Sequence, residues 1–244
     1  MNQDPNHTQH QARHAAPSTP ATKLATAMDT PNPSTRLQVA QIAGTRPYPA
    51  YIPVLIEQCR TEPDFNVRDM LTWALINHDR SEVVRQLLPE LDSAIWQARS
   101  QALHTLSKIG DPDTWPAITH AHLTDPLDEV ARTAWRAAAK VVPEEEKGRL
   151  AEVFATQFGR GDRNVQLSLS RAFIELGPDA ATPAIERVKE NGPKKAKAHA
   201  VATARLIANP DEGFDAALAE ADRIVALRGA PITDDAADEG DRPH

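Results

Sequence analysis

The sequence predicts an all-α fold in which pairs of helices stack side by side. The 244 residues are 41% apolar but only 5% aromatic, so Ala, Leu, Val and Ile must form most of the core. Small aliphatic side chains let helices approach one another closely. Apolar-periodic runs also alternate with short Gly, Pro and Asp breaks, and these runs recur at a nearly constant spacing. Together these features favour a repetitive helical array.

Five segments align on one polar residue near the start of each. They are NVRDMLTWALINH (66–78), QARSQALHTLSKI (97–109), VARTAWRAAAKVV (130–142), VQLSLSRAFIEL (165–176) and AKAHAVATARLI (196–207). The aligned residues, called anchors below, are Arg68, Arg99, Arg132, Gln166 and Lys197, spaced by 31, 33, 34 and 31 residues. Self-similarity at this period is typical of stacked two-helix repeats.

Each aligned segment is expected to be a helix. With the anchor as position zero, apolar or small residues occupy positions −1, +3, +6 and +7, which form one stripe at the helical period of 3.6. In the first unit these residues are Val67, Leu71, Ala74 and Leu75. Gly110 and Gly177 follow two of the segments directly and suit the position after a helix C-terminus.

Partner helices are predicted between the aligned segments, near the usual length of globular helices. Their ranges are Ala50–Cys59, Glu82–Leu91, Thr114–His122, Glu144–Phe158, Ala180–Glu190 and Glu212–Leu227. Ser34–Gly44 is interpreted as a partial N-terminal unit, because Arg36 precedes the first anchor by 32 residues. The last helix, extended to Arg228, is interpreted as a cap with a polar outer face. The repeat domain is therefore expected to span residues 34–228.

The two ends of the chain are predicted to be disordered. Residues 1–33 contain five prolines among polar residues, and residues 229–244 carry five acidic residues and one arginine. Such segments bury too little apolar surface to offset the entropy of ordering. We expect the three histidines of the first segment to be solvated and not metal ligands.

Composition excludes several classes of protein. No window has the ~18 uninterrupted apolar residues of a membrane span, and the N-terminus lacks a secretory apolar region. Cys59 is the only cysteine, which excludes a disulfide framework within the chain. The formal net charge of −7 argues against bulk nucleic-acid binding, which usually requires a basic face. We therefore expect a cytoplasmic protein without membrane association.

The segments QARSQALHTLSKIGDPDTWPAI and DEVARTAWRAAA resemble HEAT repeats, particularly the short variety called phycobilisome-lyase-like. The resemblance covers about residues 34–228, and it weakens where Gln166 and Lys197 replace the anchoring arginine. It implies a right-handed α-solenoid of about five two-helix repeats. It also implies that the first helices form the convex side and the second helices line a concave surface.

The anchors Arg68, Arg99 and Arg132 are the most regular polar feature of the sequence. The resemblance implies that they bond to acidic turn residues and form a structural ladder between units. The candidate acids are Asp64, Asp92, Asp125, Asp128 and Asp162. The planar guanidinium suits this role because it can bridge carboxylates at a turn.

Positions +1, +4, +5 and +8 lie away from the apolar stripe and are predicted to face the concave surface. The candidate ligand-binding residues there are Asp69, Trp73, His104, Arg136, Arg171 and Arg205. Trp73 is expected to anchor an apolar group, Asp69 and His104 to orient the ligand, and the arginines to pair with acidic groups. Five units would offer a track of about 40–50 Å, from a helix spacing of ~8–10 Å.

Structural interpretations of the same residues remain open. Trp73 could instead pack between the first and second units, and His104 could be an ordinary surface imidazole. Trp135 occupies a core position of the repeat. Trp96 and Trp115 lie near helix starts and are interpreted as plugs between units.

The sequence favours a non-catalytic scaffold or adaptor that binds a protein or peptide with acidic groups. HEAT-like di-iron hydroxylases carry repeated His-Glu pairs, and this chain has no His-Glu dipeptide. Two alternatives are a HEAT-like DNA-binding protein or alkylpurine DNA glycosylase, and a phycobilisome-lyase-like chromophore lyase. No phosphate loop, nucleophile elbow or HExxH motif is present. No cofactor or metal is expected, and a monomer or weak oligomer is consistent with polar array ends.

Overall fold

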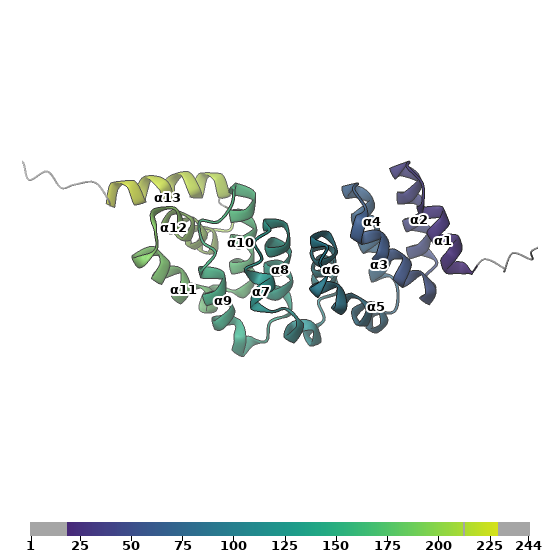
Figure 1. The fold of residues 1–244 in the computed structure, drawn as a ribbon. Coiled ribbons are helices and arrows are strands. Elements are labelled where there is room, and N and C mark those ends of the chain that lie inside the picture. Colours follow the sequence, from purple (N-terminus) through teal and green to yellow (C-terminus); the bar gives the residue numbers. More distant parts are fainter. Residues whose placement is uncertain (1–18, 212, 229–244) are drawn as a thin grey trace, which may run out of the picture.

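The computed structural model describes residues 19–211 and 213–228, and within these ranges the secondary structure is helical without β-strands. The helices form two rows that follow a common arc (Figure 1). The all-α solenoid that the sequence predicts is confirmed. No helix among the residues that the structure describes has the length and apolarity needed to cross a bilayer.

The inner row contains the anchored helices. Its members are α2 (Pro33–Thr45), α4 (Phe65–Ile76), α6 (Trp96–Ile109), α8 (Asp128–Val141), α10 (Arg163–Leu176) and α12 (Lys194–Ala208). Each inner helix contacts the next one along the chain, and the row lies on the hollow side of the arc (Figure 1). The period seen in the sequence is therefore the step from one inner helix to the next.

The outer row is less regular. It contains α1 (Pro20–Met28), α3 (Ile52–Thr61), α5 (Arg80–Leu87), α7 (His120–Leu123), α9 (Lys147–Ala155) and α11 (Pro178–Asn191). Short 3₁₀ turns interrupt it: η1 (Pro49–Tyr51), η2 (Leu88–Asp92), η3 (Pro112–Ala117) and η4 (Glu144–Glu146). The single helix predicted over Thr114–His122 is wrong. Pro116, which cannot donate a backbone hydrogen bond, lies in η3, and Thr119 then caps the separate helix α7.

The predicted disorder of residues 1–33 is wrong from residue 19 onward. The Thr19 hydroxyl accepts a hydrogen bond from the Thr22 amide, and Pro20 occupies the first position of α1, where a missing amide proton costs nothing. Leu24 and Met28 are buried in the core. Helix α1 packs against α2 and α3, so the first unit is a complete helix pair. Residues 1–18 and the predicted acidic tail, 229–244, lie outside the described residues.

The core runs between the two rows along the array. Trp135, Phe154 and Phe173 are its largest fully buried side chains. The Trp135 indole satisfies its one donor by a 2.8 Å hydrogen bond to the Leu123 carbonyl, as a buried polar group requires. Trp135 is thus a core residue, as the sequence predicts.

Arginine anchors close the turn that precedes their own inner helix. The Nη1 atoms of Arg36, Arg68 and Arg99 each donate to a backbone carbonyl six residues earlier. The distances are 2.7, 3.0 and 2.8 Å, respectively. Gln166 donates to the Gly161 carbonyl at 3.4 Å, so the substituted anchor keeps part of this contact.

The expected ladder of acidic partners is incomplete. Arg99 Nη2 lies 3.0 Å from Asp125 Oδ2, and this ion pair joins consecutive units across 26 residues. Arg36 and Glu62 form the same link across 26 residues, with two hydrogen bonds of 2.7 and 2.8 Å. The position 26 residues after Arg68 is an alanine, so no carboxylate is available there.

Arg132 also departs from the predicted ladder. The turn before α8 is held instead by Arg160, which donates to the Asp125 carbonyl at 2.6 Å and to Asp128 Oδ1 at 2.7 Å. The Arg132 Nε atom donates to Ser168 Oγ at 3.0 Å, on the next inner helix. Because another guanidinium occupies the turn, Arg132 extends along the inner surface.

Helix α13 (Phe214–Arg228) caps the array from the hollow side. It lies across α12 in Figure 1, and its buried Phe214, Ala217 and Ala221 pack on Val201 and Ala202. These two α12 residues occupy positions predicted to line the concave track. The accessible track is therefore shorter than the five units expected from the sequence, because the cap covers its last unit.

Candidate functional site

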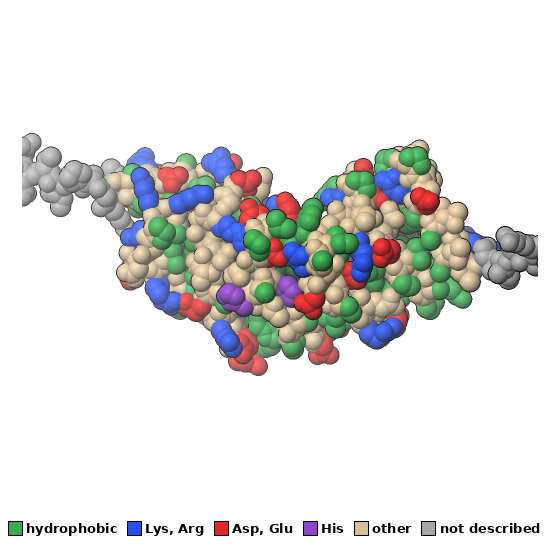
Figure 2. Space-filling view, viewed as in Figure 1, with side chains coloured by type: hydrophobic (Ala, Val, Ile, Leu, Met, Phe, Trp, Pro, Cys, Tyr) green, Lys and Arg blue, Asp and Glu red, His purple; other side chains and the backbone are tan. Residues whose placement is uncertain are grey.

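Two adjoining hollows on the inner surface form one candidate binding site, called the inner groove below. The first, about 570 Å³, lies between α4, α6 and α8, and the second, about 520 Å³, lies between α6, α8 and α10. Arg136 lines both hollows and connects them. Figure 2 shows the molecular surface hollowed between the two arms of the arc.

The inner groove has an excess of positive charge. Its basic residues are Arg68, Lys108, Arg132, Arg136, Lys140 and Arg171, and its acidic residues are Asp69, Glu129 and Glu175. Six basic against three acidic side chains give a formal excess of three positive charges, whereas the whole chain carries −7. Such a local reversal of charge raises the concentration of anionic partners at the groove.

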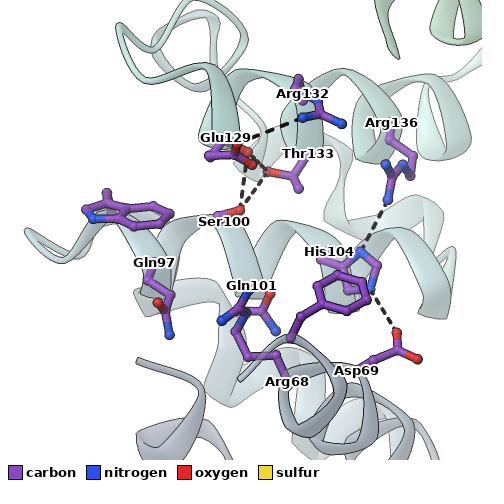
Figure 3. A pocket seen from close by; sticks show the side chains of 12 residues that line it. Arg68, Asp69, Gln97, Ser100, Gln101, His104, Glu129, Arg132, Thr133 and Arg136 are labelled. Atoms are coloured by element: carbon purple, nitrogen blue, oxygen red, sulfur yellow. Dashed lines mark hydrogen bonds and ion pairs between the residues drawn. The ribbon is translucent and has the colours of Figure 1, made fainter. Parts of the chain in front are cut away.

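Three of the predicted site residues meet in the first hollow (Figure 3). His104 Nδ1 lies 3.3 Å from Arg136 Nη1, and His104 Nε2 lies 4.0 Å from Asp69 Oδ1. The guanidinium can only donate, so Nδ1 accepts and the imidazole proton is on Nε2. Burial and the charges of Arg136 and Lys108 lower the pKa of His104, against the opposing effect of Asp69. His104 is therefore neutral at pH 7.

Arg136 stands among other cations. Partial burial and the charges of Arg132 and Arg171 lower its pKa, although a guanidinium remains protonated at neutral pH. The groove carboxylates lie close to other side chains: Glu175 is 3.4 Å from Lys140, for example. Arg171 is exposed and lines the second hollow beside Arg136, so the structure brings these two predicted residues together.

Two exposed aromatic side chains line the first hollow and were not predicted as site residues. Phe65 and Trp96 are the first residues of α4 and α6, and they are 70% and 45% exposed. The Arg68 guanidinium lies 5.8 Å from the centre of the Phe65 ring, within cation–π range. The interpretation of Trp96 as a plug between units is wrong. Both aromatic residues occupy position −3 of the repeat. This shared position is the sequence feature from which they could have been predicted as site residues.

Trp73 does not reach the inner groove. A Cβ atom placed on Gly44 of α2 would lie 2.5 Å from Trp73 Cζ3, so the indole lies directly against the α2 backbone. The side chain keeps 38% of its surface exposed. Trp73 therefore packs against the preceding unit. The prediction that Trp73 lines the same binding surface as His104 is therefore wrong.

Position +4 of the repeat lies mostly between neighbouring inner helices. Thr72 is buried with its hydroxyl 3.4 Å from that of Thr105, and Ser170 is buried 2.7 Å from Thr203. Among the residues at position +4, only Arg136 has a side chain that is exposed in the inner groove. Arg205 is half-buried on α12, outside both hollows, so the structure does not group it with Arg136 and Arg171.

The described residues offer few groups for covalent or metal chemistry. No cluster of three or more His, Cys, Asp or Glu side chains among them is placed to hold a metal ion. Cys59 is buried, and burial raises the pKa of its thiol to about 12. A thiol with this pKa is not ionised at neutral pH and is a poor nucleophile there.

Comparison with known families identifies the repeat type. The family described as HEAT repeats matches residues 52–140, which run from α3 to α8. These residues therefore match HEAT repeats, as the sequence resemblance indicates. No curated protein matches the chain.

Several solved structures are similar to this chain at low sequence identity. One is the crystal structure of an engineered protein, 19% identical, covering 86% of this chain and 97% of its own, with a TM-score of 0.45. A second engineered protein is 16% identical over 80% of this chain and 100% of its own, with a TM-score of 0.43. The complex of CpcE and CpcF of phycocyanin lyase from Nostoc sp. PCC7120 is 17% identical over 92% and 91%, with a TM-score of 0.44.

Proposed function

We propose that this protein is a non-catalytic binding scaffold whose inner groove takes an extended, acidic segment of a partner protein. The observation that carries the proposal is the charge reversal of the groove, with six basic and three acidic side chains in a chain of net charge −7. Complementary charge accelerates association and selects against basic partners.

The dimensions of the groove suit an extended chain. Neighbouring inner helices are separated by ~8–10 Å, and an extended peptide advances about 3.3 Å per residue. About every third residue of such a peptide would meet the next inner helix. An acidic residue at this spacing could pair first with Arg136 on α8 and then with Arg171 on α10.

The aromatic residues supply a second type of contact. Phe65 and Trp96 are exposed beside the basic residues, so an apolar side chain of the partner could pack on them. Burying aromatic surface often dominates the energy of a protein interface, whereas exposed charge pairs contribute less. In this proposal, the aromatics supply affinity and the arginines supply selectivity for acidic sequences.

Binding of single-stranded nucleic acid is a second candidate function. The same observation of exposed aromatics beside guanidinium groups favours it, because bases stack on aromatic rings while arginines contact phosphates. The acidic net charge of the chain opposes this candidate. The two functions differ in the ligand that should be selected.

Selection from random twelve-residue peptides tests the proposal. We expect selected peptides to be rich in Asp and Glu and to contain an aromatic residue or Leu. The double substitution Arg136→Glu and Arg171→Glu should weaken their binding at least tenfold, as measured by fluorescence anisotropy, because two pairings become repulsions.

A single charge reversal on the outer row serves as the control for the position of the charge. Lys23 is exposed on α1, away from the groove, and Lys23→Glu should leave the affinity unchanged. Selection of basic peptides, or equal losses in the two variants, would contradict the proposal. Tight binding of a single-stranded oligonucleotide with no peptide binding would favour the second candidate.

A further inference from the structure

We infer that Arg132, Arg136 and Arg171 form a subsite for a phosphorylated side chain of the bound segment. This inference rests on the proposed function and makes its ligand more specific. Arg132 and Arg136 lie one turn apart on α8, and Arg171 lies on the neighbouring α10. Arg132 lines the first hollow and Arg171 the second, and Arg136 lines both, so the subsite lies where the hollows meet.

The contacts within the protein leave donor capacity at this place. Arg132 uses Nε for Ser168, and its Nη1 is 3.9 Å from Glu129, beyond hydrogen-bond distance. Arg136 contacts the uncharged Nδ1 atom of His104. Among the described residues, no side chain forms an ion pair with Arg136 or Arg171.

The arrangement is costly without an anion. Like charges one turn apart on a helix repel each other, and Arg171 adds a third positive charge nearby. The two lysines of the second hollow, Lys108 and Lys140, add to the positive field, and Glu175 lies 3.4 Å from Lys140. Binding of an anion would relieve this repulsion.

A phosphoryl group matches the cluster better than a carboxylate. At pH 7 it carries about −1.5 to −2 charges and three acceptor oxygens, whereas a carboxylate carries one charge and two oxygens. Guanidinium groups bind phosphate oxygens through paired, charge-assisted hydrogen bonds. A cluster of three guanidiniums from two helices should therefore favour a phosphoryl group over a carboxylate.

Titration with phenyl phosphate tests the subsite directly. We expect saturable shifts of the Nε–H NMR signals of Arg132, Arg136 and Arg171, with an affinity at least tenfold higher than for benzenesulfonate. Both compounds carry a phenyl ring and a group with three terminal oxygens, but the sulfonate carries only one charge. The signal of Arg99, which is held by Asp125, should not move. Equal responses to both anions would overturn the inference.

Peptides test the same subsite in its proposed context. Phosphoserine placed in turn at each position of a selected peptide should raise the affinity at least tenfold at one position. Arg136→Gln should lower the ratio of phosphorylated to unphosphorylated affinity, whereas Lys23→Gln should leave that ratio unchanged. Charge-assisted hydrogen bonds to the lost guanidinium account for this difference.

The outcomes separate this inference from the proposed function. Peptide binding without any gain from phosphoserine overturns the subsite and leaves the proposed function in place. Saturable binding of phenyl phosphate without any peptide binding supports the anion subsite and refutes the proposed function. Circular dichroism of Arg136→Gln checks that the variant is folded.

Discussion

His199 should make the stability of the array depend on pH. It is fully buried on α12, where its ring packs edge-on against Phe158 and Phe214. Its Nδ1 atom accepts a 3.1 Å hydrogen bond from the Gly159 amide, so the ring proton is on Nε2, 3.0 Å from the Gln166 carbonyl. Protonation of Nδ1 would place two N–H groups face to face. Only the neutral imidazole fits this site.

The size of the effect follows from the pKa of His199. Burial lowers the pKa from 6.5 to about 4, against the hydrogen bond to Gln166, and the charge of Lys195 lowers it further. Between these two values the unfolded chain binds the proton and the folded chain does not, so stability falls as the pH falls. A pKa difference of about 2.5 corresponds to about 3 kcal/mol in full. Between pH 7.5 and 5.0 the loss is about 2 kcal/mol.

Urea unfolding at the two pH values measures this loss. The wild-type protein should lose about 2 kcal/mol more than His199→Gln on going from pH 7.5 to 5.0. His120→Gln removes an exposed histidine of α7 and should behave as the wild type. The reasoning is refuted if the wild type and His199→Gln lose equal stability, because the titrating group would then lie elsewhere.

Two further pairs of variants test the packing. A Cβ at Gly44 would lie 2.8 Å from the α4 backbone, so Gly44→Ala should lower the free energy of unfolding by about 1–3 kcal/mol. Gly148→Ala in α9, where the added Cβ has open space, should instead raise the free energy of unfolding by about 0.5 kcal/mol. A higher free energy of unfolding in both variants would contradict the close approach of α2 and α4 at Gly44. Glu62→Ala should cost about 3 kcal/mol, because it leaves the buried Arg36 guanidinium unpaired. Glu152→Ala removes one partner of an exposed ion pair and should change stability little, so similar losses in thermal or urea unfolding would refute this contrast.

The fold could largely be predicted from the sequence because the repeat imposes one pattern many times. Five aligned segments determined the inner row, and the core position of Trp135 followed from its place in the stripe. The first helix was missed because prolines among polar residues were interpreted as a sign of disorder. Pro20 instead starts α1, since the first helical residue needs no amide proton. Composition alone does not distinguish these two uses of proline.

The candidate site was less predictable from the sequence. A helical wheel shows on which face of a helix each side chain lies, but it does not show which residues of other helices that side chain contacts. It placed Asp69, His104 and Arg136 on one face, and the structure brings them together. It could not show that the Trp73 indole lies on the Gly44 backbone one unit earlier, since this contact depends on the spacing of two helices. The cap over Val201 was unpredictable for the same reason.

The position of α13 makes the two ends of the hollow side unequal. The cap seals the passage beyond α10, while the passage beyond α4 has no such cover among the described residues. In the proposed binding mode, a long polypeptide could therefore continue past α4 but would have to turn outward near α10. In the proposed binding mode, the groove would protect roughly ten residues of an extended partner from proteases, because four inner helices lie about 10 Å apart.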